Sequence, residues 1–259
     1  MEKTLSTHAS DWDYSEQAPY YQYRPNYSPL AIDTLLEKLA VPRDEGFLIA
    51  DVGAGTGNLT IMLEERGYTP IAIEPNDAMR EIGIQRSASK PTRWQAGTGE
   101  ATGLPDKSVQ AYLMGSSFNT TERDTTLKEA HRVLADGGWF ACMWNHRSLE
   151  EDEIQSKTQA VLKSFFPDYT GGSRREDQRP ILEASPYFSD VHYLEDSFTV
   201  QQTKEHYLLA WRSVRNQFWD LRSDEGKALF EQVMAKMSEV LPDPVPLTYT
   251  TRIWYTQKS

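Results

Sequence analysis

The chain has 259 residues, of which 39% are hydrophobic and 25% charged, as is typical of a globular protein. Its net charge of -11 disfavours a nucleic-acid partner, because binding to phosphates requires a basic surface. A single cysteine, Cys142, excludes an intrachain disulfide and a zinc site built from cysteines. No apolar run approaches the ~18 residues of a membrane span, and the first residues are polar rather than signal-like, so we expect a cytoplasmic protein without membrane contact.

The N-terminal segment, residues 1–27, begins with a polar stretch and ends with six aromatic side chains between positions 12 and 27. This composition predicts either a lid over a ligand site or an arm that packs on the domain. Residues 28–39 then place apolar side chains at helical spacing, and Ser28-Pro29 suits an N-cap followed by the first helical residue. We expect this helix to cover one face of a sheet.

The segment from residue 47 to residue 74 is the most informative part of the chain. A short apolar run predicts a buried strand over 47–52, and glycines at 53, 55 and 57 follow at once. Helical spacing over 58–66 and a second apolar run ending at Glu74 complete the pattern. Strand, glycine turn, helix, strand and terminal carboxylate are typical of one half of a nucleotide-binding α/β sheet.

The residues around the glycines indicate which nucleotide would bind. The Gly-Ala-Gly-Thr-Gly spacing differs from the G-x-G-x-x-G pattern of dinucleotide enzymes. Asp51 would repel a pyrophosphate but could pair with an ammonium group, and Glu74 could accept hydrogen bonds from ribose hydroxyls. A ligand with an amino-acid end and a ribose end, S-adenosylmethionine, satisfies both residues. NAD remains the alternative from this stretch alone.

Three further segments strengthen this interpretation. They are TGEATGLPDKSV at 98–109, EAHRVLADGGWFACM at 129–143, and Tyr23-Arg24-Pro25 followed by Tyr27. Together with the glycine turn, and in their order along the chain, these segments resemble the class I S-adenosylmethionine-dependent methyltransferases, in particular the small-molecule, methyltransferase-11-like branch. The resemblance covers roughly residues 20–145 and implies strand order 3-2-1-4-5-7-6.

The resemblance also implies a set of cofactor contacts. Arg24 is a candidate partner for the cofactor carboxylate. Thr98 stands where relatives commonly have an acidic residue, and its hydroxyl would accept more weakly from the adenine amino group. The complete expected set is Tyr23, Arg24, Asp51, Gly53, Ala54, Gly55, Thr56, Gly57, Asn58, Glu74, Pro75, Asn76, Met79, Thr98, Gly99, Glu100 and Ser116. We expect no metal ion.

The acceptor is expected beyond the carboxyl ends of the fourth and fifth strands, over 109–114 and 139–144 with a Gly137-Gly138 turn before the latter. His146 is the candidate general base, because an unperturbed imidazole titrates near neutral pH; a structural histidine is the alternative. Arg174, Arg175 and Arg179 form either a clamp for an anionic substrate or a solvated loop. The expected substrate contacts are Tyr20, Ser117, Asn119, Trp144, Arg174, Arg175, Trp211 and Arg215.

The remaining pattern predicts helices over 149–166, 203–218 and 223–240 and strands over 189–201 and 247–255. Helices in these places form a cap in many small-molecule members of the family. We therefore expect an N-terminal lid or arm (1–27), a Rossmann-like core (28–147), a helical cap insertion (148–185) and C-terminal core strands with inserted cap helices at about 203–240 (186–259). The fold class is α/β, a seven-stranded, mostly parallel sheet with helices on both faces and a helical cap.

The expected activity is methyl transfer from S-adenosylmethionine to a nitrogen, oxygen or carbon atom of a small molecule, one option being an anionic acceptor, with S-adenosylhomocysteine as the product. We expect a monomer or homodimer. Two alternatives stay open: a non-catalytic protein that binds S-adenosylmethionine, and a nicotinamide-dependent oxidoreductase. The glycine spacing and the Leu-Pro-Asp segment at 104–106 speak against the oxidoreductase.

Overall fold

The computed structural model describes residues 14–42, 47–147, 152–169, 176–214 and 218–259. Seven strands form one sheet in the order β3-β2-β1-β4-β5-β7-β6, in which the β5–β7 and β7–β6 pairs are antiparallel and the other pairs parallel. The predicted fold class and strand order are confirmed. The strands are β1 Ile49–Val52, β2 Ile71–Ile73, β3 Arg93–Gln95, β4 Val109–Gly115, β5 Leu134–Arg147, β6 His192–Gln202 and β7 Val245–Gln257.

The helices begin at the polar caps that the sequence provides. Ser28 accepts a hydrogen bond from the N–H of Ala31, Asn76 from that of Met79, and Thr203 from that of His206. The helices are α1 Pro29–Lys38, α2 Asn58–Glu65, α3 Asp77–Arg86, α4 Arg123–Val133, α5 Glu153–Phe165, α6 Arg179–Glu183, α7 Lys204–Arg212 and α8 Asp224–Val240, with 3-10 turns at Ala18–Tyr23 and Phe118–Thr120.

The fifth strand is longer than its apolar run. It begins at Leu134 and continues to Arg147, although we expected a turn at Gly137-Gly138 before a strand over 139–144. Its pairing with β4 is irregular there: Leu134 lies opposite Val109, whereas Trp139 already lies opposite Ala111. Gly137, with φ of +72°, makes the bend inside the strand, because this backbone conformation is open to glycine.

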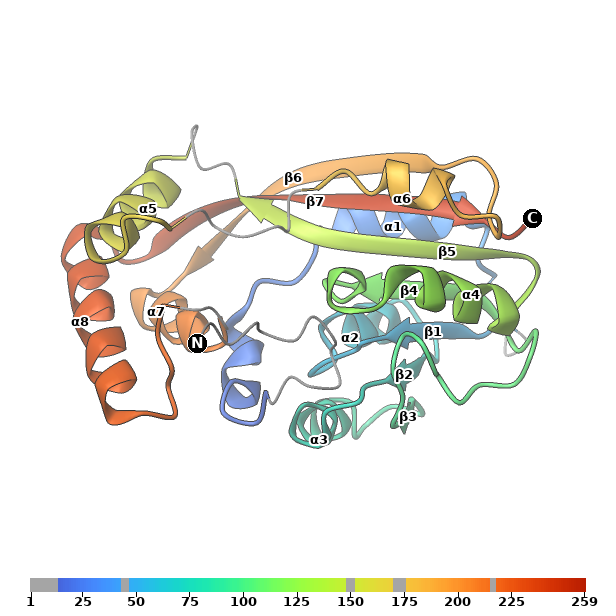
Figure 1. Ribbon diagram of the computed structural model, residues 1–259, viewed down its shortest axis with the longest axis horizontal. Helices are drawn as coiled ribbons and strands as arrows, with labels where there is room; N and C mark the ends of the chain where they lie inside the picture. The colour runs from blue at the N-terminus through green and yellow to red at the C-terminus, as the bar shows by residue number, and fades with distance from the viewer. Residues whose placement is uncertain (1–13, 43–46, 148–151, 170–175, 215–217) are drawn as a thin grey trace, which may run out of the picture.

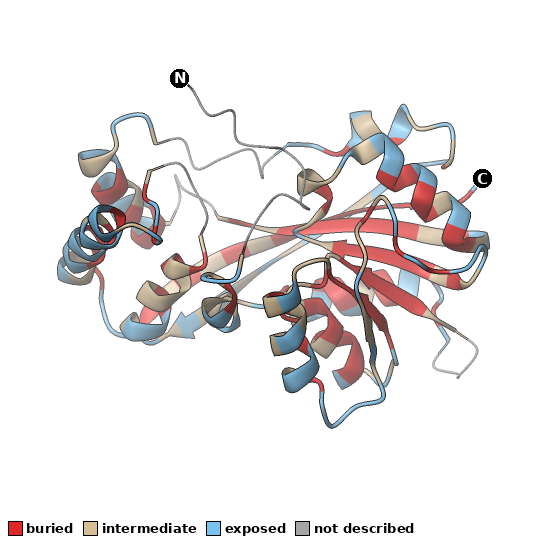
Figure 2. Cartoon of the chain, turned by 60° about the horizontal axis from the view of Figure 1, so that its bottom comes forward, coloured by how far each residue is buried: buried red, intermediate tan, exposed pale blue. Residues whose placement is uncertain are grey.

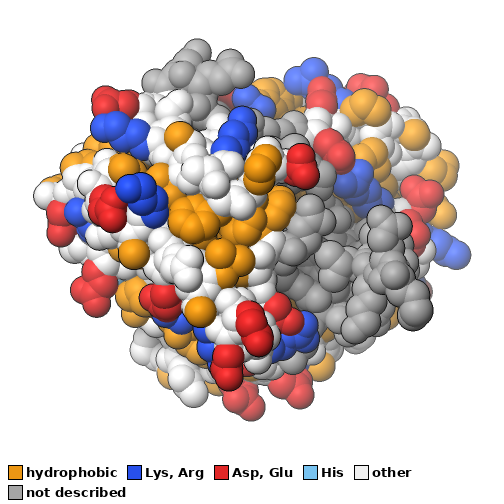
Figure 3. All heavy atoms as spheres, turned by 60° about the vertical axis from the view of Figure 1, so that its left-hand side comes forward, with side chains coloured by type: hydrophobic (Ala, Val, Ile, Leu, Met, Phe, Trp, Pro, Cys, Tyr) orange, Lys and Arg blue, Asp and Glu red, His pale blue; other side chains and the backbone are white. Residues whose placement is uncertain are grey.

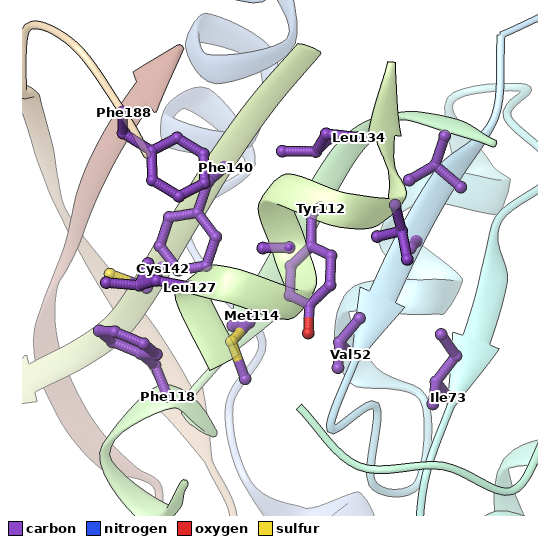
Figure 4. Packing of buried hydrophobic residues seen from close by; sticks show 14 of the residues in the cluster. Val52, Ile73, Tyr112, Met114, Phe118, Leu127, Leu134, Phe140, Cys142 and Phe188 are labelled. Carbon is purple, nitrogen blue, oxygen red and sulfur yellow. The ribbon is translucent and has the colours of Figure 1, made fainter. Parts of the chain in front are cut away.

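The buried side chains divide into layers on the two faces of the sheet and a separate cluster under the cap. On one face the rings of Phe118, Phe140 and Phe188 pack beside Cys142 and Leu127 (Figure 4). On the other face α1 and α2 pack their apolar side chains against those of the strands. Burial is concentrated on the central strands, which explains why they appear in the sequence as continuous apolar runs (Figure 2).

The cap stands at one end of the molecule. Strands β5, β7 and β6 extend well past the short parallel strands, and α5, α7 and α8 gather at their far end (Figure 1). The core of the cap, which includes Phe230, Val233 and Met237 of α8, continues onto Val245, Leu247 and Tyr249 of β7. The outer face of this end shows hydrophobic side chains ringed by charged ones (Figure 3). Because α5, α7 and α8 lie beyond the ends of the parallel strands, the cap faces the carboxyl ends of these strands, where α/β sheets bind ligands.

Candidate cofactor and acceptor site

A cavity of about 740 Å³ lies between the carboxyl ends of the parallel strands and the cap. Its walls come from the turn after β1, the ends of β2, β4 and β5, the N-terminal segment around Arg24, and the cap helices α5 and α7. The glycine turn and aromatic side chains of the cap are both part of this cavity wall. A ligand the size of a nucleoside and a second small molecule can both be accommodated at this scale.

Glu74 is fixed at one end of the cavity by the turn it faces. Its Oε2 accepts a hydrogen bond from the backbone N–H of Gly55 at 2.8 Å, and its Oε1 accepts one from that of Asn76 at 2.9 Å. Burial raises the pKa of this carboxyl, and the two N–H groups oppose the rise. Each carboxylate oxygen keeps a further acceptor site, so the pair can receive hydrogen bonds from neighbouring hydroxyls of a ligand.

Asp51, the third residue of β1, is a buried carboxyl in the same end of the cavity. Burial raises its pKa to about 7; hydrogen bonds from Thr60 lower it and the charge of Glu74 raises it further. The Thr60 hydroxyl donates to Oδ2 at 2.6 Å. Two neighbouring carboxyls with raised pKa values form a site that favours a cation, because a nearby positive charge would restore ionisation. The cavity end therefore fits a ligand that carries both an ammonium and a hydroxylated ring.

Gly53 allows the turn to approach the β4 loop. Its φ is +71°, and a Cβ placed there would lie 2.4 Å from the Cβ of Ser117. Ser117 itself donates a hydrogen bond from Oγ to the carbonyl of Val52 at 2.8 Å. The close contact of the two loops leaves room only for glycine, and it sets the distance between the turn and the acceptor half of the cavity.

Most of the residues predicted to contact the cofactor line this cavity. They are Arg24, Asp51, Gly53, Ala54, Gly55, Thr56, Asn58, Glu74, Pro75, Asn76, Met79, Thr98, Gly99 and Ser116. The cavity wall does not include Tyr23, Gly57 or Glu100. The ring of Tyr23 packs against His206 with centroids 5.0 Å apart, and the Glu100 carboxylate accepts the N–H of Glu122. Gly57 is the N-cap of α2, and a Cβ placed there would lie 3.2 Å from the ring of Trp94.

Arg24 lines the cavity but already has protein partners. Its Nε donates to the hydroxyl of Ser213 and its Nη2 to the carbonyl of the same residue, each at 2.7 Å, and its guanidinium lies 4.0 Å from the ring centroid of Tyr21. These bonds hold the N-terminal segment to the end of α7. The remaining N–H groups are the ones that could reach a ligand.

Of the residues predicted to contact or deprotonate the substrate, Ser117, Asn119, Trp144, His146 and Trp211 line the cavity. The indole of Trp144 donates from Nε1 to Oδ1 of Asn119 at 3.0 Å, so these two predicted contacts orient each other. His146 is 7% exposed at the end of β5, opposite Thr250 of β7.

The other predicted substrate contacts do not join this wall. Tyr20 lies under the guanidinium of Arg212, 5.5 Å from it, and does not line the cavity. Arg174, Arg175 and Arg215 lie outside the described residues. Arg179 forms an ion pair with Asp177 and lies over the ring of Tyr193, away from the cavity wall.

Several wall residues had no role in the sequence interpretation. They are chiefly polar or aromatic side chains on the cap side: Tyr27, Asn145, Arg147, Gln155, Thr158, Tyr207, Gln202 and Tyr249. Arg147 directly follows His146 at the end of a strand and could have been predicted on the same ground. Gln155, Thr158, Tyr207 and Tyr249 belong to predicted helices and to a predicted strand, whose inward faces depend on the tertiary structure.

The described residues lack two features that would point to other site classes. No group of three His, Cys, Asp or Glu side chains within them could hold a metal ion, and none of their helices is long and apolar enough to cross a membrane. Cys142 is fully buried, and burial raises the pKa of its thiol well above the usual value, so it is a core residue.

Part of the chain is similar in sequence to a known protein family and to several of its relatives. Residues 50–142 match the family described as "Methyltransferase domain". The uncharacterized methyltransferase Rv3342 of Mycobacterium tuberculosis is 37% identical over 128 residues, which are 49% of this chain and 49% of that protein. The ubiquinone/menaquinone biosynthesis C-methyltransferase UbiE of Rhodopseudomonas palustris is 34% identical over 120 residues, 43% of this chain and 47% of that protein. The chain thus spans about half the length of the curated relatives it matches.

Solved structures resemble the whole fold at low sequence identity. A protein from Anabaena variabilis, provisionally described as a methyltransferase of an antibiotic biosynthesis pathway, gives a TM-score of 0.57 at 17% identity, covering 91% of this chain and 99% of its own. The YcgJ protein from Bacillus subtilis gives 0.53 at 14% identity, covering 88% and 98%. These likenesses concern the fold alone.

Proposed function

Because residues 50–142 form a class I methyltransferase domain of the methyltransferase-11 type, we propose that the chain transfers a methyl group from S-adenosylmethionine to a small-molecule acceptor. One observation carries the proposal: a single cavity runs from Asp51 and Glu74 to Trp144, His146 and Trp211. The first end suits the ammonium and ribose of the cofactor, and the second offers an enclosed space for an acceptor. A site for both reactants in one cavity is what direct transfer between them requires.

The residues at the first end supply the cofactor contacts in this proposal. Glu74, already held by two backbone N–H groups, accepts from the ribose hydroxyls, and Asp51 lies opposite the ammonium. Met79 and Thr98 line the part of the wall assigned to the adenine. When bound, S-adenosylmethionine supplies an electrophilic methyl group on a sulfonium.

The residues at the second end would position and deprotonate the acceptor. Trp144, fixed by Asn119, forms one rigid wall, and Trp211 of the cap forms another. The walls exclude water and hold the acceptor atom in line with the methyl group. His146 is the proposed base for a hydroxyl or carbon acid, whereas a neutral amine would need little help. The C-methyltransferase UbiE among the relatives makes carbon one option for the acceptor atom.

Calorimetric titration with S-adenosylhomocysteine, with NADH in parallel, tests the cofactor assignment. Binding of S-adenosylhomocysteine alone supports the proposal, and binding of NADH alone would overturn it in favour of an oxidoreductase. If S-adenosylhomocysteine binds but a broad panel of small acceptors yields no methylated product, the non-catalytic binding protein becomes the better interpretation. The mixed panel should include amines, hydroxyl compounds and carbon acids.

Replacing Glu74 by alanine is expected to weaken S-adenosylhomocysteine binding by about 1–3 kcal/mol, because the ribose hydroxyls lose their acceptor and the N–H groups of Gly55 and Asn76 lose theirs. Calorimetry of the variant beside the wild type measures this difference. Glu37→Ala, on the exposed face of α1, is the control and should bind normally. Equal affinities for wild type and Glu74→Ala would remove Glu74 from the site.

A further inference from the structure

The cap side of the cavity contains a positive charge that no negative charge of the described residues matches. Arg147, the last residue of β5, lines the cavity, and its guanidinium makes no ion pair with a carboxylate of the described residues. The only described Asp and Glu side chains in the cavity wall are Asp51 and Glu74, both at the cofactor end. Arg24, the other described cation of the wall, is bound to Ser213.

Arg147 is held in place by aromatic rings. Its guanidinium carbon lies 5.2 Å from the ring centroid of Trp211 and 5.7 Å from that of Tyr249, the residue opposite it in the β5–β7 pair. The side chain of Tyr249 also forms a hydrogen bond with the guanidinium, and the N–H groups that remain are available to a ligand. A planar, oriented cation of this kind suits a ligand with two acceptor atoms in one plane.

Another polar group of the same wall has no hydrogen-bond partner in the described part of the chain. Gln155, in the first turn of α5, is 1% exposed and lines the cavity, yet neither its Oε1 nor its Nε2 has a hydrogen-bond partner among the described residues. The indole Nε1 of Trp211 is likewise buried without one. Buried amide and indole groups are normally satisfied, so these side chains point to a ligand that supplies the missing partner.

Gln155 and Arg147 are joined through the same short stretch of β7. Asp152 accepts the N–H of Gln155 through Oδ1 and the N–H of Thr248 through Oδ2, at 3.0 and 3.2 Å. Thr248 precedes Tyr249, which faces Arg147. Asp152 does not itself line the cavity, and it forms no ion pair with Arg147, so it leaves the arginine charge unmatched in the described part of the chain.

We propose that the methyl acceptor carries a carboxylate, which binds to the guanidinium of Arg147 with the Gln155 amide and the Trp211 indole as neighbouring donors. This inference rests on the proposed function, because it concerns the acceptor of that same site. One guanidinium matches the single charge of a carboxylate, whereas a phosphate dianion would keep an unmatched charge. The cap wall also contains the apolar side chains of Leu162, Val214 and Phe218, so the acceptor carries a hydrophobic part beside its carboxylate.

Matched pairs of ligands test the proposal directly. Phenylpropionate, cinnamate, indole-3-acetate and octanoate are titrated against the protein beside their primary amides and phenyl phosphate, by thermal shift and calorimetry, with and without saturating S-adenosylhomocysteine. At least one acid is expected to bind more tightly than its amide. Arg147→Gln is expected to weaken the binding of that acid by about tenfold to a hundredfold, because a charge-assisted pair is lost. The binding affinity of the matching amide should not change.

Two comparisons separate the possible failures. S-adenosylhomocysteine binding, measured first, reports on the proposed function, whereas the acid–amide difference reports on Arg147. If no acid binds better than its amide, if phenyl phosphate binds best, or if Arg147→Gln retains the acid preference, the proposal is overturned. Should Arg147→Gln fail to fold, Gln155→Leu serves instead, and an undiminished acid preference in that variant would contradict the assignment of the amide.

Discussion

Replacing Asp51 by asparagine is expected to weaken S-adenosylhomocysteine binding by about tenfold to a hundredfold while making the ligand-free protein more stable. The first effect follows from loss of the carboxylate opposite the ligand ammonium. The second follows from burial, which raises the pKa of Asp51 to about 7 and makes its ionised form costly in the free protein. At pH 8 we expect the free energy of unfolding to rise by about 2–4 kcal/mol in the variant.

The pH dependence gives this prediction a definite sign. Between about pH 4 and pH 7 the folded protein holds a proton on Asp51 that the unfolded chain has released, so the stabilising contribution of this proton falls as the pH rises through that window. Urea unfolding at pH 5 and pH 8 measures this effect. The free energy of unfolding of the wild type, relative to that of the Asp51→Asn variant, should be smaller at pH 8 than at pH 5. A difference that does not change with pH would contradict the assignment.

Ligand binding should show the complementary trend. The ligand ammonium favours ionised Asp51, so the wild-type affinity should fall as the pH drops below about 7, and binding there should release protons. The variant should lose this part of the dependence. Glu74, whose pKa burial also raises, is present in both proteins, so the pH dependence that remains in the variant includes its contribution.

Replacing His146 by alanine is expected to lower kcat by about a hundredfold or more if the acceptor is a hydroxyl or carbon acid, because the proposed base is removed. The affinity for S-adenosylhomocysteine should not change, since His146 lies at the acceptor end of the cavity. The measurement is the rate of methyl transfer as a function of pH, in which the variant should lose the rise of the rate with pH that a general base produces.

Matched controls distinguish a base from a structural histidine. His192→Ala, at an exposed position of β6, should retain full turnover. Added imidazole should partly restore the rate of His146→Ala, because a small base can enter the space left by the side chain, whereas a purely structural loss would not respond. Full turnover in His146→Ala would remove the base and favour an amine acceptor.

The cofactor end of the site was predictable because its residues are close together in the sequence. The apolar runs of β1 and β2, the glycines between them and Glu74 lie within one strand-turn-helix-strand unit, and local backbone rules place them side by side. The conformation of Gly53 and the hydrogen bonds from Gly55 and Asn76 to Glu74 complete what that pattern predicts. The sequence thus determined the β1–β2 part of the sheet, its first turn and the end of the cavity where they meet.

The acceptor end depended on contacts between distant segments. Arg147, Trp211 and Tyr249 come together because β5 pairs with β7 and α7 packs above them, and no local periodicity encodes that arrangement. The arginine run at 174–179 was the clearest basic feature of the sequence, yet Arg179 pairs with Asp177 away from the cavity. Only the tertiary structure decided which cation has no carboxylate partner among the described residues, because a charge is matched by neighbours in space rather than along the chain.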